Sequence, residues 1–170
     1  MAGRATLAAF VAELRTIGLP ISVGNGPTGV AVNPATNRVY VANSLSDTMS
    51  VIDGATNTAI GKPIAVTPRP QSVAVNPTTN RIYVTSNGPP NGPASVSVVD
   101  GATNSVVGSP ITVPFGPQGL DVNPVTNRVY ISGISDTNTG VVTVIDGSTF
   151  TVLGSPIPVG NSPTVVSVNS

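Results

Sequence analysis

The side chains that could do acid–base or metal chemistry in this chain are almost all carboxylates: six Asp residues and Glu13. The chain contains no His, which is the commonest general base and the commonest transition-metal ligand. It contains no Cys either, which excludes disulfides, thiol nucleophiles and Cys-based zinc sites. We therefore expect no metal site, no cofactor and no catalytic residue set.

The spacing of the six Asp residues indicates turns rather than catalysis. Asp53, Asp100 and Asp146 each precede a Gly at the end of an apolar run, and Asp-Gly between two strands is a strong hairpin signal. Such Asp side chains typically cap the turn through backbone amides. The remaining three stand singly: Asp47, Asp121 and Asp136. No two carboxylates share a short motif, so an enzyme would require the fold to gather them on one face.

A motif of the form Val-Asn-Pro-x-Thr-Asn-Arg-(Val/Ile)-Tyr occurs three times, at residues 32–40, 75–83 and 122–130. Its Asn residues at 33, 76 and 123 are 43 and 47 residues apart, a period typical of one supersecondary unit copied in tandem. Arg38, Arg81 and Arg128 recur in register within the motif. This recurrence predicts a structural role for them, such as bonding a neighbouring turn or Asp.

Each copy divides into four short strands, which in the first copy cover residues 29–33, 38–43, 48–53 and 58–66. Val, Ile, Thr and Tyr dominate the strands, and Pro, Gly, Asn or Asp mark their ends. Both faces are apolar, since Val39 and Val41 alternate with Tyr40 and Ala42, so each sheet should be covered on both sides. An antiparallel four-stranded sheet of about 45 residues that packs on copies of itself is a β-propeller blade.

The sequence thus predicts an all-β chain with three full blades, at residues 29–66, 72–113 and 119–159. Residues 17–23 match the fourth strand of a unit and precede the first blade. Residues 164–169 match a first strand and follow the last blade. Residues 1–16 form a separate N-terminal segment, in which Leu7, Phe10, Val11 and Leu14 share one face of a predicted short amphipathic helix.

The stretches at residues 38–43, 81–86 and 50–53 resemble the YVTN family of β-propeller repeats, named for Tyr-Val-Thr-Asn on the second strand. Tyr83-Val84-Thr85 matches the name directly, and the other two copies are close variants. The resemblance covers residues 17–170. It implies an extracytoplasmic location, whether secreted, periplasmic or on the cell surface, and it carries no shared catalytic residues.

Three blades do not close a ring, since propellers have about four or more. If each open end exposes an apolar blade face, leaving one bare forgoes on the order of 10 kcal/mol. We therefore expect a homo-oligomer that forms through open blade edges or faces. A closed ring of two copies, an open assembly, a fragment of a longer propeller and a compact four-blade ring remain alternatives.

Recognition of a ligand would fall to the loops that join one blade to the next and the second strand to the third, because loops on a rigid scaffold vary most freely. The alternative is ordinary turn chemistry. Asp121 departs from the Ala of the other copies, and either binds a ligand or accepts hydrogen bonds from nearby amides. The candidate binding residues are Asn25, Arg69, Gln71, Phe115, Gln118 and Asp121.

The composition of the chain limits the kinds of partner that we expect it to bind. The formal net charge is zero and the basic residues form no run, which argues against nucleic acid. No stretch reaches the roughly 18 apolar residues that span a bilayer. We predict a non-catalytic extracytoplasmic scaffold that self-associates or binds a protein. The alternatives are a ligand- or carbohydrate-binding module that uses the loops, and a propeller enzyme of lyase or lactonase type.

Overall fold

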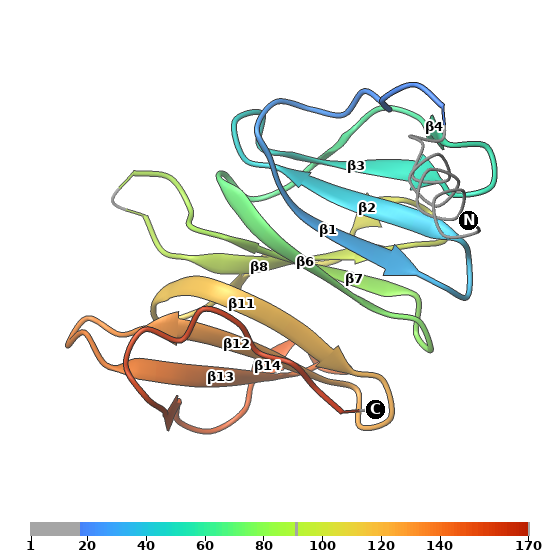
Figure 1. The fold of residues 1–170 in the computed structure, drawn as a ribbon. Coiled ribbons are helices and arrows are strands. Elements are labelled where there is room, and N and C mark those ends of the chain that lie inside the picture. Colours follow the sequence, from blue (N-terminus) through green and yellow to red (C-terminus); the bar gives the residue numbers. More distant parts are fainter. Residues whose placement is uncertain (1–17, 91, 170) are drawn as a thin grey trace, which may run out of the picture.

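The computed structural model describes residues 18–90 and 92–169, which form three antiparallel sheets arranged as an open fan (Figure 1). The first sheet, blade 1, contains β1 (Pro27–Asn33), β2 (Arg38–Asn43), β3 (Thr48–Asp53), β4 (Thr58–Ala59) and β5 (Ile64–Ala65). Blade 2 contains β6 (Pro70–Asn76), β7 (Arg81–Ser86), β8 (Ser95–Asp100), β9 (Ser105–Val106) and β10 (Ile111–Thr112). Blade 3 contains β11 (Gly116–Asn123), β12 (Arg128–Ile134), β13 (Gly140–Asp146), β14 (Thr151–Val152) and β15 (Ile157–Pro158).

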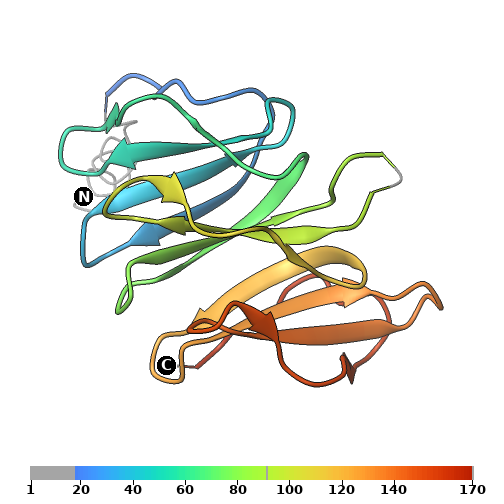
Figure 2. The same ribbon diagram turned by 180° about the vertical axis from the view of Figure 1, so that it is seen from behind.

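The three sheets repeat one topology, which confirms the all-β fold built from propeller blades. The first strand of each blade pairs with the second, and the second with the third. The first strands also lie next to one another across blades, β1 against β6 and β6 against β11, so they form the inner edge of the fan. Seen from behind, the chain crosses from the outer edge of one sheet to the inner strand of the next (Figure 2). The described residues contain no helix, and the predicted helix within residues 1–16 lies outside them.

The turn between the first and second strands forms as its sequence predicts. Asn37, Asn80 and Asn127 end the three turns with φ of 51°, 52° and 52°, a left-handed conformation that Asn tolerates. The Asn that opens each turn also holds it closed. In blade 1, Asn33 Oδ1 accepts a hydrogen bond of 3.0 Å from the amide of Ala35.

The predicted fourth strand is wrong as a continuous element, because each blade breaks it into two strands of two residues. A Gly with positive φ stands at each break: Gly61 at 64°, Gly108 at 66° and Gly154 at 62°. A Pro follows two residues later and has no N–H to donate to the third strand. The fourth strand therefore kinks at Gly and Pro, and both halves still pair with the same third strand.

The Asp-Gly signal marks the turn correctly, but the Gly serves a different purpose from the one expected of a tight hairpin. The left-handed residue is the last of the turn, Asn57 at φ 56° in blade 1 and Phe150 at φ 58° in blade 3. Gly54 has no positive φ. A Cβ there would lie 2.6 Å from Asn37 Oδ1, so Gly is needed for the close approach of the neighbouring turn.

Two apolar clusters hold the three blades together. The cluster between blades 1 and 2 contains Tyr40, Met49, Val73 and Ile82, all buried. The cluster between blades 2 and 3 includes Tyr83, Val98, Val129, Ile131 and Ile145, all buried. Blade 2 is thus covered on both faces, as the alternation of apolar residues in its strands requires.

Blade 1 is different, because the outward side of its inner strand is open. Val30 is 66 % exposed and Val32 is 55 % exposed. Their counterparts at the covered positions are Val73, 8 % exposed in β6, and Val122, 6 % exposed in β11. The exposed fractions differ because β6 and β11 each lie against a preceding blade, whereas no described residue takes that place beside β1.

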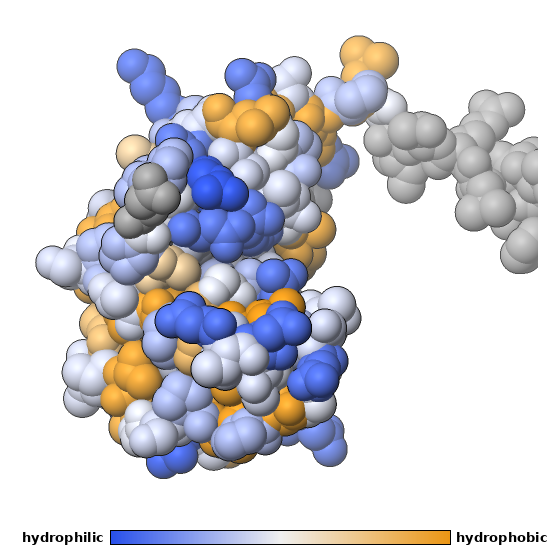
Figure 3. Space-filling model, turned by 90° about the vertical axis from the view of Figure 1, so that its left-hand side faces the viewer, coloured by the Kyte–Doolittle hydropathy of each residue, from blue (hydrophilic) through white to orange (hydrophobic). Residues whose placement is uncertain are grey.

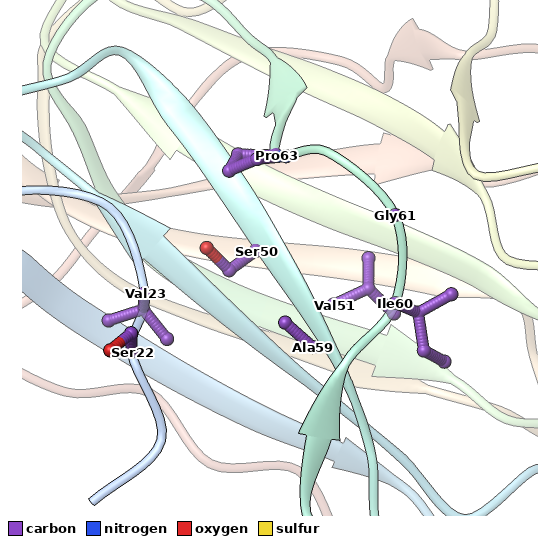
Figure 4. Close-up of a pocket in the computed structure, with 8 residues that line it drawn as sticks. All are labelled: Ser22, Val23, Ser50, Val51, Ala59, Ile60, Gly61 and Pro63. Carbon is purple, nitrogen blue, oxygen red and sulfur yellow. The ribbon is translucent and has the colours of Figure 1, made fainter.

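The predicted strand at 17–23 is wrong for its described part, since residues 18–26 contain no strand before β1. A fourth strand needs the third strand of its own blade as partner, and residues 18–90 and 92–169 supply none for it. The segment instead lies on blade 1, where the amide of Gly24 donates to Ser50 Oγ at 3.3 Å. Ser22 and Val23 face β3 across a cavity of about 130 Å³ that Ile60 and Pro63 complete (Figure 4).

The predicted strand at 164–169 is also not formed as a strand, because no second strand pairs with it within the described residues. Its position is nevertheless that of an inner strand, beside β11. A Cβ on Gly119 would lie 2.8 Å from the Val166 amide nitrogen and 2.9 Å from Val165 Cα. The amide of Val168 donates to Asp121 Oδ2 at 2.7 Å.

Candidate functional site

The loops between blades and the loops between second and third strands meet at one end of the fan, which we call the loop face. Backbone hydrogen bonds join the two kinds of loop: the amide of Leu45 donates to the carbonyl of Asn25 at 3.1 Å. Seen from this end, hydrophilic side chains form several separate groups with apolar ones between them (Figure 3). The opposite end carries the Asn-Pro and Asp-Gly turns.

Arg69 lies on the loop face and links two blades through its backbone. It has a positive φ of 58°. Its amide donates to Asp47 Oδ1 at 2.8 Å, and its carbonyl accepts the Asn87 amide at 3.2 Å. These bonds use the main chain, so the guanidinium group remains exposed at the surface.

Gln71 and Gln118 line the same hollow, which opens where the inner strands begin. It has a volume of about 220 Å³. Its wall includes the matching residues Thr28 of β1 and Thr164 of residues 164–169, which we call the C-terminal segment. Gln71 Nε2 donates to Ser44 Oγ at 3.2 Å. This hollow, which we call the inner hollow, therefore offers uncharged hydrogen-bonding groups from four equivalent positions.

Phe115 lines a second hollow, of about 360 Å³, between blades 2 and 3, which we call the Phe115 hollow. Pro93 and Pro114 add apolar wall, while Asn87 and Asp136 contribute polar groups. The sequence placed Phe115 and Asp136 in separate loops and did not predict this pairing. An apolar ring beside a carboxylate suits a ligand with one apolar face and hydrogen-bond donors.

Asn25 lies apart from both hollows. Its amide donates to Ser46 Oγ at 3.1 Å, so its main chain fixes the loop before β1 against the loop after β2. Among the candidate residues, the fold thus brings Gln71 and Gln118 into one hollow and puts Phe115 in another. Arg69 and Asn25 lie in loop contacts.

Asp121 lies within β11, opposite Tyr130 in the strand pairing and away from the loop face. Its Oδ1 accepts the amide of Val122 at 2.8 Å, and its Oδ2 accepts the amide of Val168 at 2.7 Å. Ala31 and Ala74 hold this place in the other blades. The carboxylate therefore fastens the C-terminal segment to blade 3.

The three turn Asp residues have one geometry. In blade 1, Asp53 Oδ1 accepts the amides of Ala55 and Thr56 at 2.8 and 3.0 Å. Asp100 and Asp146 accept the equivalent amides of their own turns. Because backbone N–H groups favour the ionised carboxylate, they hold the pKa of Asp53 and Asp146 below the usual value.

The recurring Arg residues lie beside these turns. Arg81 forms an ion pair with Asp100, whose pKa this hydrogen bond and the turn amides lower to about 2. Arg38 donates across the blade boundary to the carbonyl of Gly101. The charge of Arg128 is a smaller contribution to the lowered pKa of Asp146.

The lowered pKa of Asp100 predicts that the free energy of unfolding decreases in acid. A carboxyl whose folded pKa is lowered stabilises the fold above its unfolded pKa, and this contribution is lost as the pH falls through the folded pKa. The loss for Asp100 should therefore lie between pH 3.8 and about 2. The side chains of Arg81 and Asp100 are 28 % and 24 % exposed, so salt should weaken their pairing.

An NMR titration of the Asp carboxyl groups should show Asp100 with the lowest pKa of the three turn residues. Arg81→Gln should raise the pKa of Asp100 towards that of Asp53 and leave Asp53 itself unchanged. An unchanged Asp100 in Arg81→Gln would show that the turn amides alone lower its pKa.

The described residues contain no group of three or more His, Cys, Asp or Glu side chains placed to hold a metal ion. The turn carboxylates lie at the end opposite the loop face, and Asp47 and Asp136 belong to different blades. The part of the chain that the structure describes also contains no helix long and apolar enough to cross a membrane.

Among solved structures, the chain is similar to hydrazine synthase of Kuenenia stuttgartiensis, with a TM-score of 0.69 and 24 % identity over 79 % of this chain and 37 % of that one. It is also similar to a putative 6-phosphogluconolactonase of Bacteroides fragilis, with a TM-score of 0.67 and 16 % identity over 86 % of this chain and 43 % of that one. The WD40 repeats of RRP9 match with a TM-score of 0.64 and 10 % identity over 80 % of this chain and 39 % of that one.

These likenesses show the fold alone. The chain spans less than half the length of the solved structures that it resembles. In sequence, 35 residues, 21 % of the chain, are 71 % identical to 8 % of the PE-PGRS family protein PE_PGRS18 of Mycobacterium tuberculosis. No protein-family model matches the chain. The chain therefore has a β-propeller-like fold.

Proposed function

We propose that this chain is a non-catalytic scaffold of the YVTN propeller type that acts outside the cytoplasm and associates with copies of itself or with another protein. The uncovered side of β1, with Val30 and Val32 exposed, is the observation that supports this function. At the matching places in blades 2 and 3, Val73 and Val122 are buried and Val75 and Leu120 are half-buried. An apolar strand face left uncovered is typical of an interaction surface. The location follows from the YVTN resemblance.

The solution mass of residues 1–170 tests the proposal. Size-exclusion chromatography with light scattering, repeated over a range of protein concentrations, should give a mass above 16.9 kDa that rises with concentration. A mass of one chain at every concentration would contradict self-association. Capture of a single defined partner by that monomer would then support the protein-binding form of the proposal.

The Phe115 hollow supports a second candidate, a carbohydrate-binding module. A sugar ring presents C–H groups that pack on an aromatic face and hydroxyl groups that donate to a carboxylate. Phe115→Ala and Asp136→Asn should each abolish glycan binding without changing the urea midpoint. Asp47→Asn, in the equivalent loop of blade 1 outside the hollow, serves as the control. A glycan array on which the parent chain binds nothing would contradict this candidate.

A further inference from the structure

The C-terminal segment occupies the place of a fourth inner strand. A Cβ on Gly29 of β1 would lie against the Gln71 carbonyl oxygen, 3.0 Å from Ser72 Cα and 3.1 Å from the Val73 amide nitrogen. Gly119, its counterpart in β11, meets the Cα of Val165 at 2.9 Å and the amide nitrogen of Val166 at 2.8 Å. The same backbone atoms approach the same position, so residues 164–168 lie on β11 as β6 lies on β1.

The segment has one covered side and one free side. Val166 and Val168 are half-buried towards β11, as expected for residues that replace Val73 and Val75. Val165 and Ser167 alternate with them and point away, and Val165 is 76 % exposed. In β1, the matching positions Gly29 and Ala31 face the next inner strand.

The other end of the fan carries the complementary surface. Val30 and Val32 are the exposed counterparts of Val73 and Val75, which the preceding inner strand covers in blade 2. The free side of residues 164–168 and the open side of β1 are therefore the two halves of a contact that the chain makes twice internally, between β1 and β6 and between β6 and β11.

A hydrogen-bond pattern repeats across the same boundaries. Asn33 at the end of β1 donates from Nδ2 to Asn80 Oδ1 in the next blade at 2.8 Å. Asn76 at the end of β6 donates to Asn127 Oδ1, also at 2.8 Å. The residue in blade 1 that matches Asn80 and Asn127 is Asn37, whose Oδ1 accepts no hydrogen bond from residues 18–90 and 92–169.

We propose that the free side of residues 164–168 packs on the open side of β1 in a second copy of the chain, with Asn169 of one copy donating to Asn37 of the other. This contact rests on the proposed self-association and states which surfaces carry it. Val165 takes the place of Ser72, the matching residue that carries a side chain. Ser72 of β6 shows that a side chain fits there, donating to the Gln118 carbonyl at 3.3 Å.

The contact joins two different surfaces, so it is heterologous. A copy that offers its C-terminal segment still has its own β1 free for another copy. Two copies whose geometry closes would complete a ring, and copies that do not close would continue as an open assembly. The continuity with the internal contacts selects a second copy over an unrelated partner, since this chain carries both matching halves.

A substitution that introduces a charge on the open side of β1 tests the proposed contact between copies. Val30→Asp places a carboxylate in the proposed interface and should abolish the oligomer in light scattering, while the circular dichroism spectrum stays as in the parent. Val125→Asp is the matched control, because Val125 is 83 % exposed in the turn after β11 and lies on neither surface. It should keep the mass of the parent.

A cysteine pair gives a second test that does not depend on Val30→Asp folding. The chain has no Cys, so a mixture of Asn37→Cys and Asn169→Cys single variants can form disulfide-linked dimers only between copies. Oxidation should yield the mixed dimer from this mixture, and little from Asn37→Cys mixed with Val125→Cys.

The outcomes of these experiments distinguish a failure of the proposed contact from a failure of the proposed self-association. A parent chain that is monomeric at every concentration would overturn self-association and the contact together. An oligomeric parent that Val30→Asp leaves intact, and whose Asn37→Cys and Asn169→Cys variants do not cross-link, would overturn this contact alone. An oligomer lost in Val30→Asp but kept in Val125→Asp, with the mixed disulfide formed, supports it.

Discussion

Replacing Tyr83 by alanine is expected to lower the free energy of unfolding by about 3–5 kcal/mol. Tyr83 is fully buried and belongs to the cluster that joins blades 2 and 3. Removing its ring leaves a cavity in the cluster that blade 2 shares with Val129 and Ile131 of blade 3. Urea denaturation followed by circular dichroism measures the change, and Tyr130→Ala, at the half-buried counterpart in blade 3, should cost less.

Tyr83→Phe distinguishes the contribution of the aromatic ring to stability from that of the hydroxyl group. The hydroxyl oxygen of Tyr83 is buried and has no hydrogen-bond partner among the described residues. Burial raises the pKa of Tyr83 to about 12, so the phenol stays neutral over the normal pH range. Because an unpaired buried polar group costs about 1–3 kcal/mol, Tyr83→Phe should be neutral or stabilising. A loss as large as that of Tyr83→Ala would mean that the hydroxyl bonds to a group or water in solution.

Replacing Gly29 by alanine is expected to destabilise the chain by about 1–3 kcal/mol or more, because the new methyl group meets backbone rather than a flexible side chain. The atoms in its way are the carbonyl oxygen of Gln71, the Cα of Ser72 and the amide nitrogen of Val73, all in β6. Blades 1 and 2 would have to separate slightly, which loosens the cluster around Tyr40 and Ile82.

Gly116→Ala is the matched control for Gly29→Ala. Gly116 also lies near the start of an inner strand, its φ is not positive, and a Cβ there meets no atom within 4 Å. The two variants therefore add the same methyl group to the same kind of strand, and only Gly29 has a neighbour to displace. Equal urea midpoints for the two variants would contradict the close approach of β1 and β6.

Only part of the candidate site could be predicted from the sequence. The loops that carry Gln71, Phe115 and Gln118 are recognisable because they vary between copies whose framework is constant. The division of these residues between two hollows depends on how neighbouring blades approach, which no local pattern records. Asp136 reaches the same hollow as Phe115 from the loop between β12 and β13, and Asp121 lies away from the loops and holds residues 164–168.

The sequence by itself determined the repeat, the all-β architecture and the turns. These features depend on short-range chemistry: Asn at positive φ, Asp bonded to amides two and three residues on, and apolar residues alternating along each strand. The break in the fourth strand was also encoded locally, by Gly and Pro, although the apolar residues around them led to the prediction of one continuous strand.

The tertiary structure decided which of the equivalent positions are covered. Val30, Val73 and Leu120 occupy the same place in their strands, yet Val30 is open while Val73 is buried, because burial depends on a neighbouring blade rather than on the residue. For the same reason, residues 18–23 and 164–169 carry strand-like sequences without forming strands. A strand requires a partner edge, and a sequence pattern cannot supply one.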